Sequence, residues 1–283
     1  MTVDISRKSF RPRRNYAGVV WQQGRVELDS ERNEAFAIAD RQRRARTIDL
    51  VRRCGYPRAL TDSFRIDTTG GTVAIGPGRY YVDGLLAENF GLPEALGGRE
   101  AFEPSLEEMR SADFVPFGEQ PFRLDPPAPD PGEGRHLVYL DVWRRTVTHL
   151  EDPDLVEIAV GVDTTGREQT IWQVRALGGM PSDATCETPD ADLPGWLDAI
   201  RPSDGRLSVF EVPQDEPDDP CELPPGAGYR ALENRTYRVE IHDRTPDGTW
   251  RFKWSRHNGV IATRVLTIVS ATELAVARVA KDD

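Results

Sequence analysis

The chain has 283 residues, of which 38% are hydrophobic and 29% are charged, and its formal net charge is −11 at pH 7. This length fits one large domain or two ordinary ones, and no apolar run approaches the roughly 18 residues needed to cross a bilayer. The basic N-terminus, residues 1–16, has no apolar stretch after it, so a secretory signal peptide is not expected.

Charge is distributed unevenly along the chain. Residues 1–60 contain 14 Lys and Arg against 7 Asp and Glu, a formal charge of +7, whereas the rest contain 22 against 40, a formal charge of −18. A basic head on an acidic body favours docking onto an acidic partner, including a neighbouring copy of the same chain. Nucleic acid is the rival partner, although less favoured, and a solvated helix without a docking role is the third interpretation.

The first predicted elements are a hook and a long helix. Residues 18–29, GVVWQQGRVELD, predict a short strand or an extended hook, because apolar side chains stand between two glycines. A helix of about 24 residues, about 36 Å long, is expected to follow. Asp29 or Ser30 is predicted to cap its start, and Gly55 to end it.

The predicted helix has too little apolar surface to lie over a broad core. Its apolar positions form a narrow seam of Ala35, Ile38, Ala45 and Ile48. Such a seam favours packing along another helix or a partner, so residues 1–55 are predicted to be an attachment or oligomerisation device. Its arginines would then meet acidic surface on a neighbour. The predicted contact residues are Trp21, Gln22, Gln23, Arg25, Asn33, Phe36, Ile38, Arg41, Arg44 and Ile48.

From residue 64 onward the apolar period is that of strands. Residues 72–89 contain TVAIG, RYYV and LLAEN, which predict a three-stranded meander with turns at Gly76–Gly78 and Asp83–Gly84. The Asp-Gly pair suits a type I′ turn, because both central residues of that turn need a positive φ. Residues 91–135 are rich in proline and predict a linker or long surface loop, with a short helix near residues 103–111.

Further strands are predicted in the second half of the chain. Residues 136–150, 157–162 and 169–177 predict three strands, with Val138, Leu140 and Val142 on one face of the first. Residues 178–228 are irregular and acidic, and loops of this kind are often ordered by partners.

Residues 236–259 predict an antiparallel pair of strands. It would place Tyr237, Val239 and Ile241 opposite Trp250, Phe252 and Trp254. Two more strands are expected about residues 270–272. The abrupt end of the sequence after them predicts a fragment of a longer protein.

Together these patterns predict a mainly β (α+β) fold with antiparallel strands and hairpins and one long N-terminal helix. Three regions are expected. They are the hook and helix, residues 1–55; a β-meander region with a proline-rich linker, residues 56–130; and an antiparallel β domain, residues 131–283.

No motif for nucleophilic, metal-dependent or nucleotide chemistry is present in the sequence, so no catalytic residue, metal ligand or cofactor is expected. Glu240, His242 and Asp243 are compatible with a proton-transfer pair, but a solvated strand face of alternating charges explains them better. The acidic run at residues 215–219 lacks the ligand order of a calcium loop.

The cysteines and tryptophans each leave two readings open. Cys54, Cys186 and Cys221 favour three buried thiols, and a Cys186–Cys221 disulfide stays open. A set of four tryptophans favours core positions over an exposed sugar-binding platform. These are Trp143, Trp172, Trp250 and Trp254.

Three stretches of the sequence resemble a bacterial family of unknown function whose members accompany phage tails and phage-tail-like contractile injection systems. The first is YAGVVWQQGRVELDSERNEAFAI at residues 16–38, and the second is HLVYLDVWRRTVTHLEDPDLVEIAVG at residues 136–161, followed by TIWQVRAL. The third is GYRALENRTYRVEIHDRTPDGTWRFKWSRHNGV at residues 228–260. The chain departs from the family pattern at WRRTVT, where the family has WERHVT, and at Arg235 and Thr236. These departures leave the expected fold unchanged and put the family's partner contacts in doubt for this chain. The family has no settled catalytic residues, so none are carried over.

The resemblance implies a structural component of a baseplate, tail cap or fibre attachment, built as a symmetric oligomer, with a trimer favoured. Its partners would be other tail or baseplate proteins. It would assemble in the cytoplasm, in a particle that can be released. The alternative function is a carbohydrate-binding or carbohydrate-active module of a tail or spike.

Overall fold

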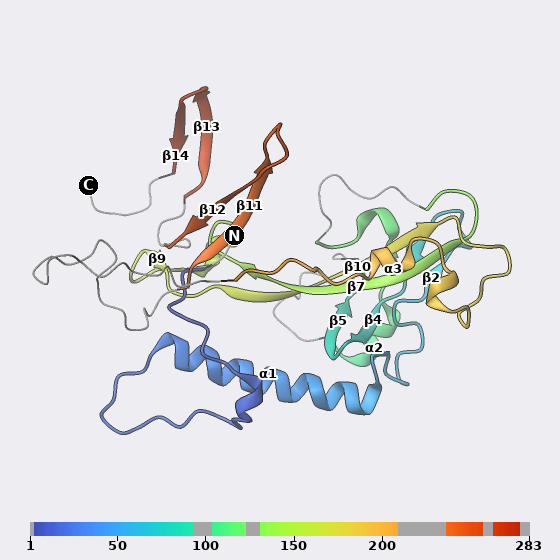
Figure 1. Cartoon of the computed structure of the whole chain (residues 1–283). Coiled ribbons are helices and arrows are strands. Elements are labelled where there is room, and N and C mark those ends of the chain that lie inside the picture. The colour runs from blue at the N-terminus through green and yellow to red at the C-terminus, as the bar shows by residue number, and fades with distance from the viewer. Residues whose placement is uncertain (1–2, 93–103, 123–130, 209–235, 257–262, 278–283) are drawn as a thin grey trace, which may run out of the picture.

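The computed structural model describes residues 3–92, 104–122, 131–208, 236–256 and 263–277. The fold is mainly antiparallel β with one long N-terminal helix, which confirms the predicted fold class (Figure 1). A ribbon of two long strands, β7 (His136–Val147) and β10 (Arg167–Gly178), runs through the molecule. Helix α1 (Asp29–Val51) lies along one side of this ribbon, and two hairpins rise from the other side (Figure 1).

The ribbon is a regular antiparallel ladder that pairs every residue of β7 with one of β10, from Val147 opposite Arg167 to His136 opposite Gly178. Side chains alternate between its two faces. The face that carries Leu140 and Val142 also carries Trp172 opposite Val142, and this face covers the core. The prediction that Leu140 and Val142 share a face with Val138 is therefore confirmed.

Two small sheets pack under one end of the ribbon and complete the core. The first orders its strands β1-β4-β5, with bounds Cys54–Gly55, Gly78–Val82 and Leu85–Asn89. The second orders its strands β2-β3-β6, with bounds Ile66–Asp67, Ala74–Ile75 and Val115–Pro116.

The core is centred on Trp172, which is 1% exposed. Its indole N–H donates to the carbonyl oxygen of Glu88 at 2.6 Å, and Phe64 meets its ring edge-on with the centroids 4.9 Å apart. The other buried members are Ile75, Ala87, Phe117 and Val174. They come from both sides of the predicted boundary near residue 130, and the domain boundaries stay a prediction.

The Asp-Gly turn is confirmed, and the three-stranded meander is wrong. Strands β4 and β5 form a hairpin, in which Asp83 has φ 46° and Gly84 has φ 77°. Strand β3 pairs instead with β2 and β6, because Gly76 exchanges backbone hydrogen bonds with Phe64 and Arg65. Pro77 has no N–H to donate to a hairpin ladder, so the chain passes here from the sheet that contains β3 to the sheet that contains β4.

The prediction of a surface loop over residues 91–135 is wrong for residues 104–122. The short helix α2 (Leu106–Ser111) is present, as predicted, and Ser105 caps it by accepting from the amide of Glu108. The 3₁₀ turn Phe117–Glu119 then carries Phe117 into the core. The buried Gln120 amide group bonds to both the N–H and the carbonyl of Val174. Residues 93–103 and 123–130 lie outside the described part of the chain.

Both predicted caps of α1 are wrong. The N-cap position is taken by Leu28, whose N–H donates to the Glu31 carboxylate, while Asp29 accepts instead from the N–H and hydroxyl of Ser6. At the other end the helix stops at Val51, and Arg52 takes the left-handed φ of 69°. Gly55 belongs to strand β1, which pairs with β4, so it does not end the helix.

The prediction of one strand at residues 157–162 is wrong, because the region between β7 and β10 forms a short hairpin instead. Strands β8 (Val156–Glu157) and β9 (Val162–Asp163) are joined by a turn in which Gly161 has a positive φ of 75°. A 3₁₀ turn, Pro153–Leu155, precedes them. After β10, residues 179–208 are irregular as predicted, apart from Asp190–Asp192 and α3 (Trp196–Ala199).

The two C-terminal hairpins are confirmed. They are β11 (Arg238–Arg244) with β12 (Trp250–Ser255), and β13 (Val265–Ser270) with β14 (Glu273–Val276). The prediction of buried thiols is wrong for Cys54 and Cys186, which are exposed, and Cys221 lies outside the described residues. A further 3₁₀ turn, Pro12–Arg14, lies shortly before the hook.

Replacing Trp172 with Phe is expected to lower the free energy of unfolding by about 2–3 kcal/mol, because it leaves a void and an unpaired Glu88 carbonyl in the core. The matched control Trp250→Phe changes an exposed ring and should stay within about 0.5 kcal/mol of wild type. Urea unfolding monitored by circular dichroism measures both. Equal losses for the two variants would contradict this assignment of the core.

Candidate protein-docking surface

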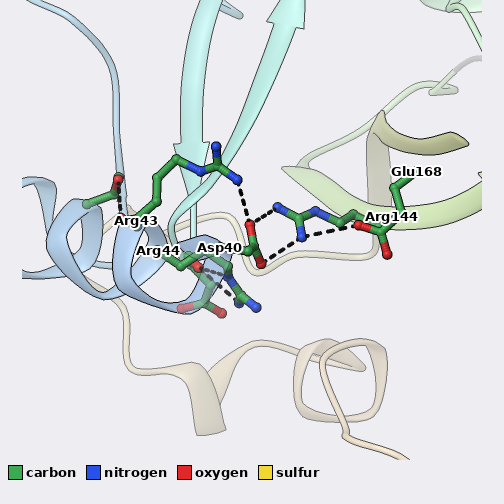
Figure 2. Close-up of polar contacts among 7 residues, drawn as sticks. Asp40, Arg43, Arg44, Arg144 and Glu168 are labelled. Atoms are coloured by element: carbon green, nitrogen blue, oxygen red, sulfur yellow. Dashed lines mark hydrogen bonds and ion pairs between the residues drawn. The ribbon is translucent and has the colours of Figure 1, made fainter. Parts of the chain in front are cut away.

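An ion pair fixes α1 to the ribbon. Arg144 lies two residues beyond Val142 on the same face of β7, and its two terminal nitrogens donate to the two Asp40 oxygens at 2.8 and 2.6 Å (Figure 2). Both side chains are partly buried, and Arg43 adds a second donor to Asp40 at 3.0 Å. The hydrogen bonds from Arg144 hold the pKa of Asp40 down, at about 2. No periodic pattern in the sequence indicates this pair, since the two residues are 104 positions apart.

Other contacts complete the attachment of α1 to its own chain. The Arg44 guanidinium donates to the Asp83 carbonyl oxygen in the β4–β5 turn, at 3.2 and 3.3 Å (Figure 2). Ile38 is 2% exposed, so it packs inside its own chain. The prediction that the whole apolar seam needs a partner is therefore wrong at Ile38.

Several side chains of α1 stay uncovered. Phe36 and Leu50 are exposed large apolar residues, and Arg41 and Arg46 are also exposed. Neither of these two arginines forms an ion pair with a residue in the described part of the chain. Exposed guanidinium groups and isolated apolar side chains of this kind are suited to a polar contact with another protein.

The hook before α1 is extended and uncovered. The sequence predicts either a short strand or an extended hook here. Residues 16–22 form no strand, so the extended hook is the form that the structure shows. Val20 is 89% exposed, and Trp21 and Val26 are also exposed. Two contacts link it to the helix: the Gln42 side-chain amide donates to the Ala17 carbonyl oxygen at 3.4 Å, and Arg32 pairs with Glu27. An apolar extended segment outside the core is typical of a docking element.

The structure divides the predicted contact residues into three groups. Ile38 is buried, and Arg44 and Ile48 are half-buried against their own chain. The others are exposed, namely Trp21, Gln22, Gln23, Arg25, Asn33, Phe36 and Arg41. The part played by these residues in a contact between chains stays a prediction.

The β11–β12 hairpin carries an apolar face that sequence reasoning placed in a core. Val239 lies opposite Trp254, and Ile241 lies opposite Phe252. A bulge at His242 shifts the register, so Trp250 lies opposite Arg244, whose guanidinium stacks over the indole at 5.2 Å. The predicted opposition of apolar sets is thus confirmed for two pairs. Together the apolar residues of this side form the aromatic face, which consists of Val239, Ile241, Trp250, Phe252 and Trp254.

The opposite face of the same hairpin is ionic. Glu240 pairs with Arg238 at 2.9 Å and with Lys253 at 3.5 Å, and Arg251 pairs with Asp243. The hydrogen bonds from Arg251 lower the pKa of the Asp243 carboxyl. Such a division into an apolar and an ionic face is typical of a strand pair with one side against a core and one side in water.

The aromatic face nevertheless lies open. Trp250, Phe252 and Trp254 are 61%, 65% and 62% exposed, and none of the three belongs to the buried core cluster. The prediction that Trp250 and Trp254 are core residues is therefore wrong, whereas Trp172 is buried as predicted. An isolated two-stranded hairpin is only marginally stable in water, so packing of other protein surface on this face would stabilise the hairpin.

The last hairpin exposes apolar side chains as well. Val265, Leu266, Ile268 and Val269 of β13 and Leu274 and Val276 of β14 are all exposed. Two bulges in the pairing place apolar residues on both faces. The guanidinium of Arg264 donates to the Leu150 carbonyl oxygen, which ties the base of β13 to the corner that precedes β8.

No comparable grouping suggests catalysis. The bulge makes His242 an extra residue, so Glu240 and His242 no longer continue one regular face. Within the described residues, no group of three or more His, Cys, Asp or Glu side chains is placed to hold a metal ion. Among the described helices, none combines the length and hydropathy needed to cross a bilayer. The acidic run at residues 215–219 lies outside the described part of the chain.

The ribbon and the irregular segment after it provide the link to known proteins. Residues 130–209 match the model of a family of unknown function, DUF6519. This match covers β7, β10 and α3, and it carries no link to phage tails. No curated protein and no solved structure matches the chain.

Replacing Asp40 with Asn is expected to lower the free energy of unfolding by about 1–2 kcal/mol at pH 7, because Arg144 loses its carboxylate. The folded-state pKa of Asp40, about 2, is below its ordinary value of 3.8, so this stabilisation is complete above about pH 4 and is lost as the pH falls through 2. The gap between wild type and variant should therefore close between pH 4 and pH 2.

Urea unfolding at fixed protein concentration across this pH range measures the gap. The control Asp49→Asn changes an exposed carboxylate on the same helix and should stay within about 0.5 kcal/mol at every pH. A D40N variant as stable as wild type at pH 7 would show that the ion pair does not hold α1.

Proposed function

We propose that this protein is a structural component that acts by docking onto other protein chains, and that it does so in a phage-tail-like particle. Its place would be the baseplate, the tail cap or the attachment of a fibre. It would assemble in the cytoplasm as a closed homo-oligomer, a trimer, and leave the cell with the particle.

The observation that carries the proposal is the open aromatic face of the β11–β12 hairpin. Three large aromatic side chains exposed on one side of a strand pair form an apolar patch of the kind that marks a protein-protein contact. Trp and Tyr dominate the binding energy of such contacts. The exposed hook and the exposed β13–β14 hairpin provide two more apolar elements outside the core.

The setting in a particle is supported by resemblance alone. The hook, the ribbon and the β11–β12 hairpin fall within the three stretches that resemble the family accompanying phage tails. The described residues also offer no grouping for metal chemistry, and the sequence has no motif of a known enzyme class. An assembly part needs surfaces rather than a catalytic site, and surfaces are what this chain exposes.

The test is where the protein goes in cells that produce it. If the proposal holds, the tagged full chain sediments with sheath-and-tube particles during ultracentrifugation and stays with them in moderate salt. The purified chain should have the mass of a trimer in light scattering. A chain found entirely in the low-mass fraction of cells that make such particles would overturn the proposal.

A carbohydrate-binding module is the second candidate, and the exposure of Trp250 and Trp254 is the observation that favours it. Exposed tryptophans can stack on the apolar faces of sugar rings. On this hypothesis, added bacterial surface polysaccharide protects these two indoles from acrylamide quenching, and the protection is absent in the variant Trp250→Ala with Trp254→Ala. Quenching that polysaccharide leaves unchanged would exclude the candidate.

A further inference from the structure

Two open apolar surfaces of the chain lie on opposite sides of the β7–β10 ribbon. The hook lies with α1 on one side, and the hairpins rise on the other (Figure 1). Within one chain the hook leaves the aromatic face open, as the exposure of Phe252 and Trp254 shows. Surfaces that face away from each other on one molecule are the two halves of a head-to-tail contact between copies.

We propose that the hook of a second copy of this chain covers the aromatic face of the β11–β12 hairpin. The inference rests on the proposed function, because it names the surfaces through which the chain would self-associate. The contact is heterologous, with a hook from one copy and a hairpin from the next. Repeated around a rotation axis, it closes into a ring.

Backbone chemistry supports this pairing. Residues 16–22 of the hook are extended and belong to no strand ladder, and Val19, Val20 and Trp21 have high β-propensity. A two-stranded hairpin has two free edges, and an extended segment that adds to one of them gains main-chain hydrogen bonds. A sheet of three strands is also more stable in water than an isolated pair of strands.

The apolar area is of the right size. Large aromatic side chains bury about 150–250 Å² each, and the three aromatics of the aromatic face are 61–65% exposed, so together they still offer about 300–450 Å². Val239 and Ile241 add to this area, and the neighbouring β13–β14 hairpin exposes six more apolar side chains. A stable interface buries about 800 Å² on each partner, which these elements together can supply.

Charge complementarity identifies the partner as a second copy. Residues 41–53, in the last part of α1 and just beyond it, hold six Arg and one Asp, a formal charge of +5, although Arg43 and Arg53 pair with Asp40 and Asp83 of their own chain. Residues 148–165, around β8 and β9, hold five acidic residues and no Lys or Arg, a formal charge of −5, of which Glu151 pairs with Arg145. Arg264 ties this acidic corner to the base of β13, so the corner adjoins the hairpins. Each copy therefore carries a basic surface on its hook side and an acidic surface on its hairpin side.

Other occupants explain less. Nucleic acid would use the free arginines Arg41 and Arg46, but it would leave the aromatic face and the hook without a role. A sugar would use the aromatic face and leave the hook and the opposite charges unused. A second copy uses all of them.

The experiment mixes two variants of the full chain. The hook variant carries Val20→Ser and Trp21→Ser, and the hairpin variant carries Phe252→Ser and Trp254→Ser. All four residues are exposed, so both variants should keep the wild-type far-ultraviolet circular dichroism. Light scattering at equal concentration then gives the mass of each variant alone and of the 1:1 mixture.

If the inference holds, each variant alone is a monomer, whereas the mixture forms a dimer. In the mixture an intact hook from one variant meets an intact hairpin from the other, and the ring cannot close. The control Arg251→Ser with Lys253→Ser changes the ionic face of the same strand and should keep the wild-type mass.

Charge reversal tests the second half of the contact. The pair Arg41→Glu and Arg46→Glu should raise the dissociation constant at least about tenfold, and so should the pair Asp154→Arg and Glu157→Arg. All four changes in one chain reverse both surfaces and should restore most of the wild-type affinity. Failure of the combined variant to recover would contradict the assigned surfaces.

The outcomes separate this inference from the proposed function. A hook variant that keeps the wild-type mass beside a monomeric hairpin variant would mean that hairpins pair with hairpins, which overturns the inference and leaves self-association intact. A wild-type monomer that still sediments with particles would also overturn the inference, because the occupant would be another protein. A wild-type monomer absent from particles would overturn both.

Discussion

The ladder between β7 and β10 is the constraint on which the rest of the molecule depends. One end of this ribbon places Trp172, Leu140 and Val142 over the two small sheets and so closes the core. Farther along the same face, Arg144 holds α1 through Asp40. The corner between the strands supports the base of β13. A register slip of one residue would turn each of these side chains to the wrong face at once, because alternate residues of a strand point to opposite sides.

The described chain has one part that buries its large apolar side chains and another part that leaves them exposed. Residues 64–92, residues 104–122 and the ribbon contribute the buried core, with the edge-to-face pair Phe64 and Trp172 at its centre. The hook and the two C-terminal hairpins have the same alternating patterns but no core of their own to cover them. A strand pair with an open apolar face is marginal in water, and this supports our proposal that these elements take part in contacts between chains.

The long helix combines both roles. Asp40, Arg44 and Ile38 attach it to its own chain, whereas Phe36, Arg41 and Arg46 stay exposed. Because a bidentate, partly buried ion pair anchors it, the helix has a fixed direction relative to the ribbon. Residues 18–22 of the hook belong to no strand ladder of their own chain, and we propose that the hairpin of a second copy pairs with them.

Local pattern in the sequence determined the elements that need only neighbours along the chain. The long helix, the Asp-Gly hairpin turn of β4 and β5, and the hairpins β11–β12 and β13–β14 all follow from period and turn chemistry. Only the tertiary structure decided which surfaces are covered. The alternation in β11–β12 predicts an apolar face but not its burial, and a single Phe117 between prolines gives no period to detect. The partner of Asp40 lies more than a hundred residues away, and such a pairing depends on how the ribbon folds back on α1 rather than on any local preference.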